Sequence, residues 1–155
     1  MFLTGHGVDQ TVRRSDNNDL LAYNQLVVQH QDEAYTLACD LLGNESGAAA
    51  VVEEAFQDSF RDGRTPQAQF RLEILKKVLA FCLKRAKILP GPGAMAHLLT
   101  GLSNTEKAIL ILVDCLEMSY ADAGYVTGKP AAGVRQTLAK ARYFLSRNLL
   151  PVNKA

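Results

Sequence analysis

The chain of 155 residues is 48% apolar and 21% charged, a composition typical of a folded soluble protein and too apolar for a disordered one. Its longest apolar run covers residues 108–113, whereas a membrane-spanning helix needs about 20 apolar residues, and residues 1–7 lack the features of a signal peptide. We therefore expect a cytoplasmic protein without membrane contact, and the net charge of +1 by itself argues against nucleic-acid binding.

Residue types that support catalysis or bind metal ions are isolated in this sequence. The cysteines show no CxxC spacing, and no histidine has an acidic or cysteine partner at the spacing of a triad or a metal site. We expect the cysteines to be reduced core residues, and the protein to have no enzyme activity, metal site, cofactor or small-molecule substrate. The residues concerned are Cys39, Cys82, Cys115, His6, His30 and His97.

The charges are distributed unevenly along the chain. Residues 9–58 carry ten acids and two bases, a net charge of −8, so this segment cannot bind the phosphate groups of a nucleic acid. Residues 61–87 carry eight bases and two acids, and residues 129–154 carry six bases and no acid, so that each segment has a net charge of +6. Two basic segments of this kind indicate phosphate-facing surfaces, with solvated helix faces as the alternative.

Apolar residues recur at helical spacing in the first half of the chain. The pattern predicts one or two helices over residues 18–42. A second run follows Asn44, a residue that favours the N-cap position, and ends near Gly63. A third helix is predicted for residues 70–85, and we expect these helices to form one bundle.

The second half has sharper helix boundaries. Ser103 and Glu106 form a capping-box pattern at the start of one helix. A short helix is predicted to start after Ser119 and to end at Gly128, and a last helix to cover residues 131–147. No strand pattern is visible, so the sequence predicts an all-α fold.

The composition also predicts the domain organisation. Residues 90–93 read Pro-Gly-Pro-Gly, which cannot continue a helix and is typical of a linker. We therefore expect a mobile tail of residues 1–15, a helical domain of residues 16–87, a linker of residues 88–98 and a second helical domain of residues 99–150.

A short helix, a glycine turn and a basic helix form the pattern of a helix-turn-helix, in which the first residues of the second helix meet base edges in the major groove. Arg135, Gln136 and Thr137 occupy those positions. They suit the role because arginine pairs with guanine, glutamine pairs with adenine and a threonine methyl contacts thymine. Helical hairpins with a glycine turn also occur in proteins that never bind DNA.

Motifs in both halves of the chain occur in an order that points to a family. The first half contains NQLVVQHQDEAYTLA, LLGN and VVEEAFQDSFR, followed by FRLEILKKVLAFCLKR. The second half contains LSNTEKAILILV, MSYADAGYVTGKP and GVRQTLAKAR. Over roughly residues 20–148, the chain resembles the extracytoplasmic-function sigma factors, the smallest type of the sigma-70 family, with region 2 in the first half and region 4 in the second.

The resemblance implies a transcription initiation factor that binds core RNA polymerase and promoter DNA, with an anti-sigma factor as a further partner. Region 2 would dock on the beta-prime clamp helices through Val52, Glu53 and Phe56, and region 4 would rest on the beta flap. The minus-10 strand would contact the cations and an aromatic residue of the first basic segment, residues 61–87. These residues are Arg64, Lys76, Lys77, Phe81, Lys84 and Arg85. The minus-35 element would meet the recognition helix through Arg135, Gln136, Thr137, Lys140 and Arg142.

The chain departs from the family pattern at several positions. Ala49, Ala50 and Glu53 replace an acidic pair and a glutamine at the clamp contact. Gly124 and Gly133 stand inside the helix-turn-helix, where a glycine costs about 1 kcal/mol relative to alanine, so we expect both to loosen it. The changes at Ala49 and Ala50 favour a second hypothesis, a degenerate sigma-like decoy that binds an anti-sigma factor or polymerase without recognising promoters, whereas the basic residues 129–154 argue against it. A third, a DNA-binding regulator that acts without polymerase, leaves the region 2 resemblance unexplained.

Overall fold

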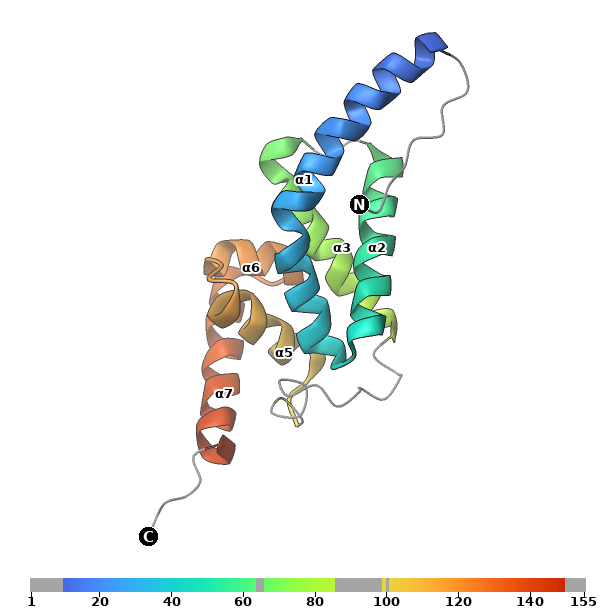
Figure 1. Ribbon diagram of the computed structural model, residues 1–155. Helices are drawn as coiled ribbons and strands as arrows, with labels where there is room; N and C mark the ends of the chain where they lie inside the picture. Colours follow the sequence, from blue (N-terminus) through green and yellow to red (C-terminus); the bar gives the residue numbers. More distant parts are fainter. Residues whose placement is uncertain (1–9, 64–65, 86–98, 100, 150–155) are drawn as a thin grey trace.

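The computed structural model describes residues 10–63, 66–85, 99 and 101–149, and every regular element in them is helical, which confirms the predicted all-α fold. Figure 1 shows the arrangement. The first helical unit consists of α1 (Gln10–Leu42), α2 (Glu45–Asp62), a 3-10 turn η1 (Gln67–Gln69) and α3 (Phe70–Arg85). The second helical unit consists of α5 (Asn104–Leu110), a π-helical turn η2 (Ile111–Cys115), α6 (Tyr120–Thr127) and α7 (Ala131–Leu149).

The helix ends follow the predicted capping residues. The Asn44 side chain accepts a hydrogen bond from the Gly47 amide at 3.0 Å, and α2 ends at Gly63 in the left-handed conformation. Ser103 and Glu106 form the complete capping box, in which each side chain accepts a hydrogen bond from the other residue's amide. Because these caps satisfy amides that have no partner within the helix, they fix where the helices start.

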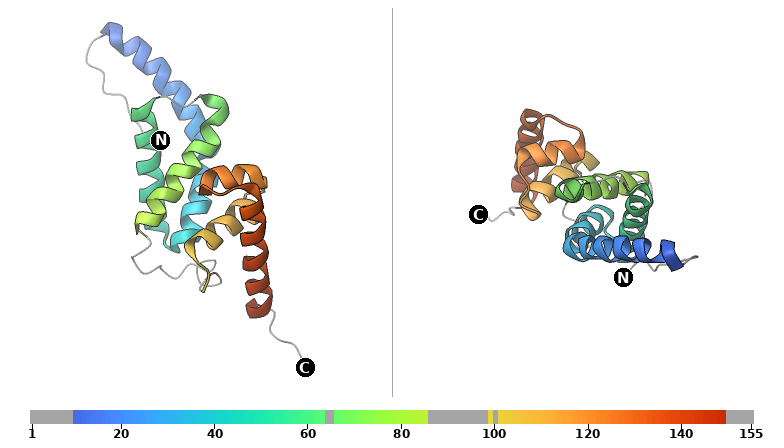
Figure 2. Two further views of the ribbon diagram at one scale, coloured as in Figure 1. Left: turned by 180° about the vertical axis from the view of Figure 1, so that it is seen from behind. Right: turned by 90° about the horizontal axis from the view of Figure 1, so that it is seen from above.

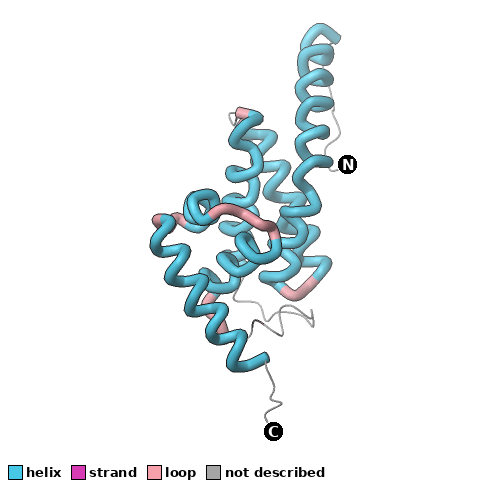
Figure 3. The backbone as a smooth tube through the Cα atoms, turned by 90° about the vertical axis from the view of Figure 1, so that its left-hand side faces the viewer, coloured by secondary structure: helices cyan, strands magenta, loops and turns pink. Residues whose placement is uncertain are grey.

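The first helical unit is an antiparallel bundle around aromatic residues. Tyr23 of α1 inserts between the rings of Phe60 and Phe70, whose centroids lie 5.0 and 5.6 Å away. Its hydroxyl donates a hydrogen bond to the Phe56 carbonyl at 2.6 Å, and burial raises the pKa of Tyr23 to about 12. Since α1 begins at Gln10, residues 10–15 are helical, and its N-terminal turns extend beyond the bundle (Figure 3).

The second helical unit is closed by contacts between its beginning and its end. Gly101 has a φ of 103°, and a Cβ atom there would lie 2.6 Å from Cζ of Phe144 in α7. Helix α5 widens into η2, where the Leu116 amide bonds to the Ile111 carbonyl at 2.9 Å. The π-helical turn therefore replaces a regular helix end, a feature that is frequent at functional positions.

The two helical units pack against each other. Helix α6 lies across α3, as the views from the front, from behind and from above show (Figures 1 and 2). Helix α5 and η2 also contact α1. Buried apolar residues of both units belong to one continuous cluster. The predicted linker of residues 88–98 lies outside the described residues. None of the described helices is long and apolar enough to cross a membrane.

Candidate nucleic-acid interface and neighbouring contacts

The turn between α6 and α7 is tight because its backbone folds back onto Gly124. The Gly124 carbonyl accepts hydrogen bonds from the amides of Gly128 and of Lys129, the latter at 2.9 Å. A Cβ atom on Gly124 would lie 2.4 Å from the Lys129 carbonyl oxygen, so the close approach requires glycine. The expectation that Gly124 loosens the motif is thus wrong, whereas a Cβ on Gly133 has ordinary contacts of 3.5 Å to Pro130.

Helix α7 separates a buried stripe from an exposed basic face. Val134, Leu138 and Ala141 are buried, as the helical spacing predicts. Arg135, Gln136 and Lys140 are exposed, and Thr137 is half-buried. The Arg135 guanidinium lies 5.9 Å from the centroid of the Tyr120 ring, a cation–π contact with the first residue of α6. The predicted base-contacting residues therefore share the accessible start of one helix.

Arg142 differs from the other predicted DNA-binding residues of α7 because it has an acidic partner inside the protein. Its guanidinium contacts both carboxylate oxygens of Asp114, at 2.6 and 3.2 Å. The hydrogen bond to Asp114 raises the pKa of Arg142. Since Asp114 belongs to η2, the pair connects α7 to the π-helical turn, a role that the sequence pattern did not indicate.

The predicted minus-10 cations of α3 all have partners within the chain, and Arg64 lies outside the described residues. Lys77 bonds to Asp58 at 2.8 Å, which lowers the pKa of that carboxyl group. Arg85 lies 3.4 Å from Glu54, which belongs to α2 as Asp58 does. The remaining cations lie over aromatic rings, Lys84 at 5.3 Å from Phe81 and Lys76 at 4.8 Å from Tyr125.

The predicted polymerase-binding residues differ in accessibility. Val52 is 2% exposed and the Phe56 side chain is fully buried, whereas Glu53 is exposed. A groove of about 480 Å³ lies beside them, between α1 and α2. Its lining consists of Gln31, Asp32, Tyr35, Thr36, Ala49 and Val52. Because α2 turns Phe56 toward α1 and α3, helical spacing alone could not separate its core face from its docking face.

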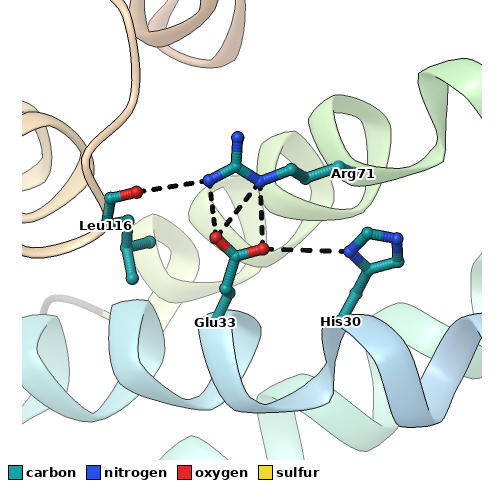
Figure 4. Close-up of polar contacts among 4 residues, drawn as sticks. All are labelled: His30, Glu33, Arg71 and Leu116. Atoms are coloured by element: carbon teal, nitrogen blue, oxygen red, sulfur yellow. Dashed lines mark hydrogen bonds and ion pairs between the residues drawn. The ribbon is translucent and has the colours of Figure 1, made fainter.

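Figure 4 shows a polar cluster that the sequence did not reveal. Arg71 of α3 donates from Nε and Nη2 to the Glu33 carboxylate of α1, with a shortest distance of 2.6 Å, and from Nη2 to the Leu116 carbonyl at 3.3 Å. The bond to Glu33 raises the pKa of Arg71. His30 lies 3.8 Å from Glu33, yet burial lowers its pKa. Arg71 is 38 residues from Glu33 and 45 from Leu116, so no local pattern in the sequence links it to these partners.

The cysteines and acids give no sign of a metal centre among the residues that the structure describes. Cys82 is buried, which raises the pKa of its thiol to about 12 and makes it a core residue as expected. Cys39 is half-buried. Cys115 is exposed at the end of η2, so the expectation of a core position is wrong for this residue.

Comparison with known proteins gives a match at the level of structure. The sequence matches no protein-family model and no curated protein sequence. The structure is similar to that of CnrH, an extracytoplasmic-function sigma factor, solved in complex with the cytosolic domain of CnrY. The TM-score is 0.77 at 20% sequence identity, and the match covers 84% of this chain and 88% of CnrH. The chain therefore has the fold of an extracytoplasmic-function sigma factor.

Proposed function

We propose that this protein is a sigma-factor-like transcription initiation protein, which binds core RNA polymerase and directs it to promoter DNA. The observation that carries the proposal is the start of α7, where Arg135 and Gln136 are exposed directly behind a tight glycine turn. This geometry suits the major groove, and α7 contains no acidic residue that would repel phosphate. The fold shared with CnrH, a sigma factor, supports the same function.

For polymerase we propose docking at the groove between α1 and α2. Val52 forms part of the groove lining, and Glu53 is exposed one helical turn beyond Ala49, at the edge of that groove. Phe56 would support this surface from the core without contacting the partner. With Asp32 and Glu53 at the groove, the surface suits a partner with basic side chains, and its apolar lining suits a helix.

A second candidate is the sigma-like decoy, which binds an anti-sigma factor or polymerase without recognising promoters. The observation that favours it is the internal pairing of Lys77, Arg85 and Arg142, because each cation already has a carboxylate partner. The anti-sigma class of partner is supported by the neighbouring structure, in which CnrH is bound to an anti-sigma domain. Neither candidate requires a cofactor or a catalytic residue.

The two functions can be separated with purified chain and bacterial core RNA polymerase. A pull-down would compare Glu53→Ala with Glu45→Ala, a matched exposed glutamate in the first turn of the same helix. Run-off transcription from a fragment library would compare Arg135→Ala with Arg147→Ala, an exposed cation in the last turn of α7. Promoter-specific transcripts lost only with Arg135→Ala would support the initiation factor. Polymerase binding without transcripts would support the decoy, and no polymerase binding would rule out the initiation factor.

A further inference from the structure

The outer face of α1 has a row of apolar side chains that nothing in the described part of the chain covers. Leu21, Val28 and Tyr35 are 63%, 58% and 37% exposed. They stand seven residues apart, which places them on one side of the helix over about 21 Å. Single exposed apolar residues are ordinary, whereas an aligned set of them marks an interaction surface. We call this row the α1 stripe.

The surroundings of the α1 stripe are free of charge. Residues 20–31 contain no Asp, Glu, Lys or Arg, although the segment of residues 9–58 to which they belong has a net charge of −8. The one histidine among them, His30, is buried against Phe70. A solvated helix face in so acidic a segment would be expected to carry charges, whereas the cores of protein interfaces are depleted in them. The composition therefore indicates a face that another protein covers.

The two ends of the α1 stripe differ in shape. Tyr35 lines the groove of about 480 Å³ between α1 and α2. At the other end the N-terminal turns of α1 extend beyond the bundle, so a second chain can lie alongside them (Figure 3). An exposed apolar side chain, Leu21, and a hollow beside Tyr35 thus stand on one surface at equal distances from Val28. A surface that carries both a protruding group and a hollow in this way can complement itself.

We propose that a second copy of this chain covers the α1 stripe, with the two α1 helices antiparallel and a two-fold axis at Val28. Under such an axis each residue meets the one at the same distance on the other side of the axis. Val28 therefore packs against Val28 of the second copy. Leu21 packs against Tyr35 of the second copy, at the edge of its groove, and the same contact forms again on the other side of the axis.

The polar residues beside the α1 stripe favour the antiparallel direction. The axis places Gln25 opposite Gln31 of the second copy, so that the two amides can bond to each other. It also places Asn24 opposite Asp32, an amide donor opposite an acceptor. A parallel pair would instead place Asp32 opposite Asp32, where like charges repel, and would keep Leu21 away from the groove. Polar pairs of this kind fix the register of two helices.

The dimer would compete with polymerase for one surface. Gln31, Asp32 and Tyr35 line the groove to which we assign polymerase, and α1 of the second copy would lie over the same residues. Self-association would then keep the chain from polymerase at high concentration. This competition rests on the proposed function, whereas the dimer does not.

Sedimentation velocity of the full-length chain between about 1 and 200 μM tests the dimer, because the interface is small and we expect a dissociation constant on the order of 10 μM. The mass should rise toward twice the 16.9 kDa of one chain. Val28→Glu places two carboxylates at the axis and should weaken self-association about tenfold or more. Leu83→Glu is the matched control, because Leu83 is a 42% exposed apolar residue of α3. Circular dichroism confirms that each variant is folded.

Cysteine cross-linking tests the direction of the helices. In a background with Cys39→Ser and Cys115→Ser, mild oxidation should link Val28→Cys to its own copy, because residues at the axis are adjacent. Leu21→Cys should stay unlinked, since the axis separates the two copies of that position by about 21 Å. Cross-linking of Leu21→Cys to itself would overturn the antiparallel arrangement.

A wild-type chain that stays monomeric at every concentration would overturn the dimer, and so would equal self-association of wild type and Val28→Glu. At concentrations where the wild type is dimeric, Val28→Glu should capture more core RNA polymerase in a pull-down than Leu83→Glu does. Equal or weaker capture by Val28→Glu would overturn the competition. A wild-type dimer together with no polymerase binding by any form would support the dimer and refute the proposed function on which the competition rests.

Discussion

Replacing Gly124 by alanine should destabilise the protein although the residue lies inside a helix. In an open helix the change would stabilise by about 1 kcal/mol. Here the new Cβ would lie 2.4 Å from the Lys129 carbonyl oxygen, which is backbone and cannot rotate away. The turn would have to move by about 1–1.6 Å to reach an ordinary contact, and overpacking of this kind costs about 1–3 kcal/mol. Because a backbone clash lies at the upper end of that range, we expect a net loss of about 1–2 kcal/mol.

Gly133→Ala is the matched control, because its Cβ would have only ordinary 3.5 Å contacts with Pro130. It should gain up to about 1 kcal/mol from helix propensity. Urea denaturation followed by circular dichroism would measure both variants, and a change of 1 kcal/mol corresponds to a melting temperature shift of about 2–4 °C at this size. A Gly124→Ala variant as stable as wild type, or more stable, would refute the reasoning that the turn leaves no room for a side chain.

Three further predictions concern the first helical unit. Tyr23→Phe removes the 2.6 Å bond to the Phe56 carbonyl and should cost about 1 kcal/mol of unfolding free energy in urea denaturation, whereas an unchanged midpoint would contradict it. Since burial lowers the pKa of His30 from 6.5, its stabilising contribution is complete above pH 6.5 and is lost as the pH falls through the folded pKa. His30→Gln should therefore flatten the decline of stability between pH 7 and about 5, and an undiminished decline would rule out His30 as its source. Lys77→Ala should raise the pKa of Asp58 toward 3.8 in a carboxyl NMR titration, and no change would mean that the 2.8 Å contact does not persist in solution.

The helix boundaries could be predicted because the interactions that set them are local. Asn44, Ser103 and Gly128 each form hydrogen bonds with residues within four positions in the sequence, so the local sequence is enough to predict these helix ends. The buried stripe of α7 could be predicted equally well, because it follows from the helical period of 3.6 residues. The exposed start of α7 followed from that stripe.

The contacts between the units could not be predicted in this way. Arg71 and Leu116 are 45 residues apart, and Tyr125 and Glu73 are 52 residues apart. Their pairing depends on how α6 lies across α3, which no local spacing encodes. The same limit applies to the partners of the α3 cations, because the segment charges show that acids and bases are present but not that Lys77 meets Asp58. The roles of Val52, Glu53 and Phe56 toward polymerase stay predictions.

The contact of Gly101 with Phe144 has a consequence for how the second helical unit can be joined to other chains. The first and last portions of this unit lie side by side, so the chain enters and leaves the unit at neighbouring points. Segments with adjacent ends can be inserted into or removed from a host protein without pulling its chain apart. A carrier protein could therefore accept this unit at one place on its surface, and it would also have to cover the apolar residues that pack against the first helical unit here.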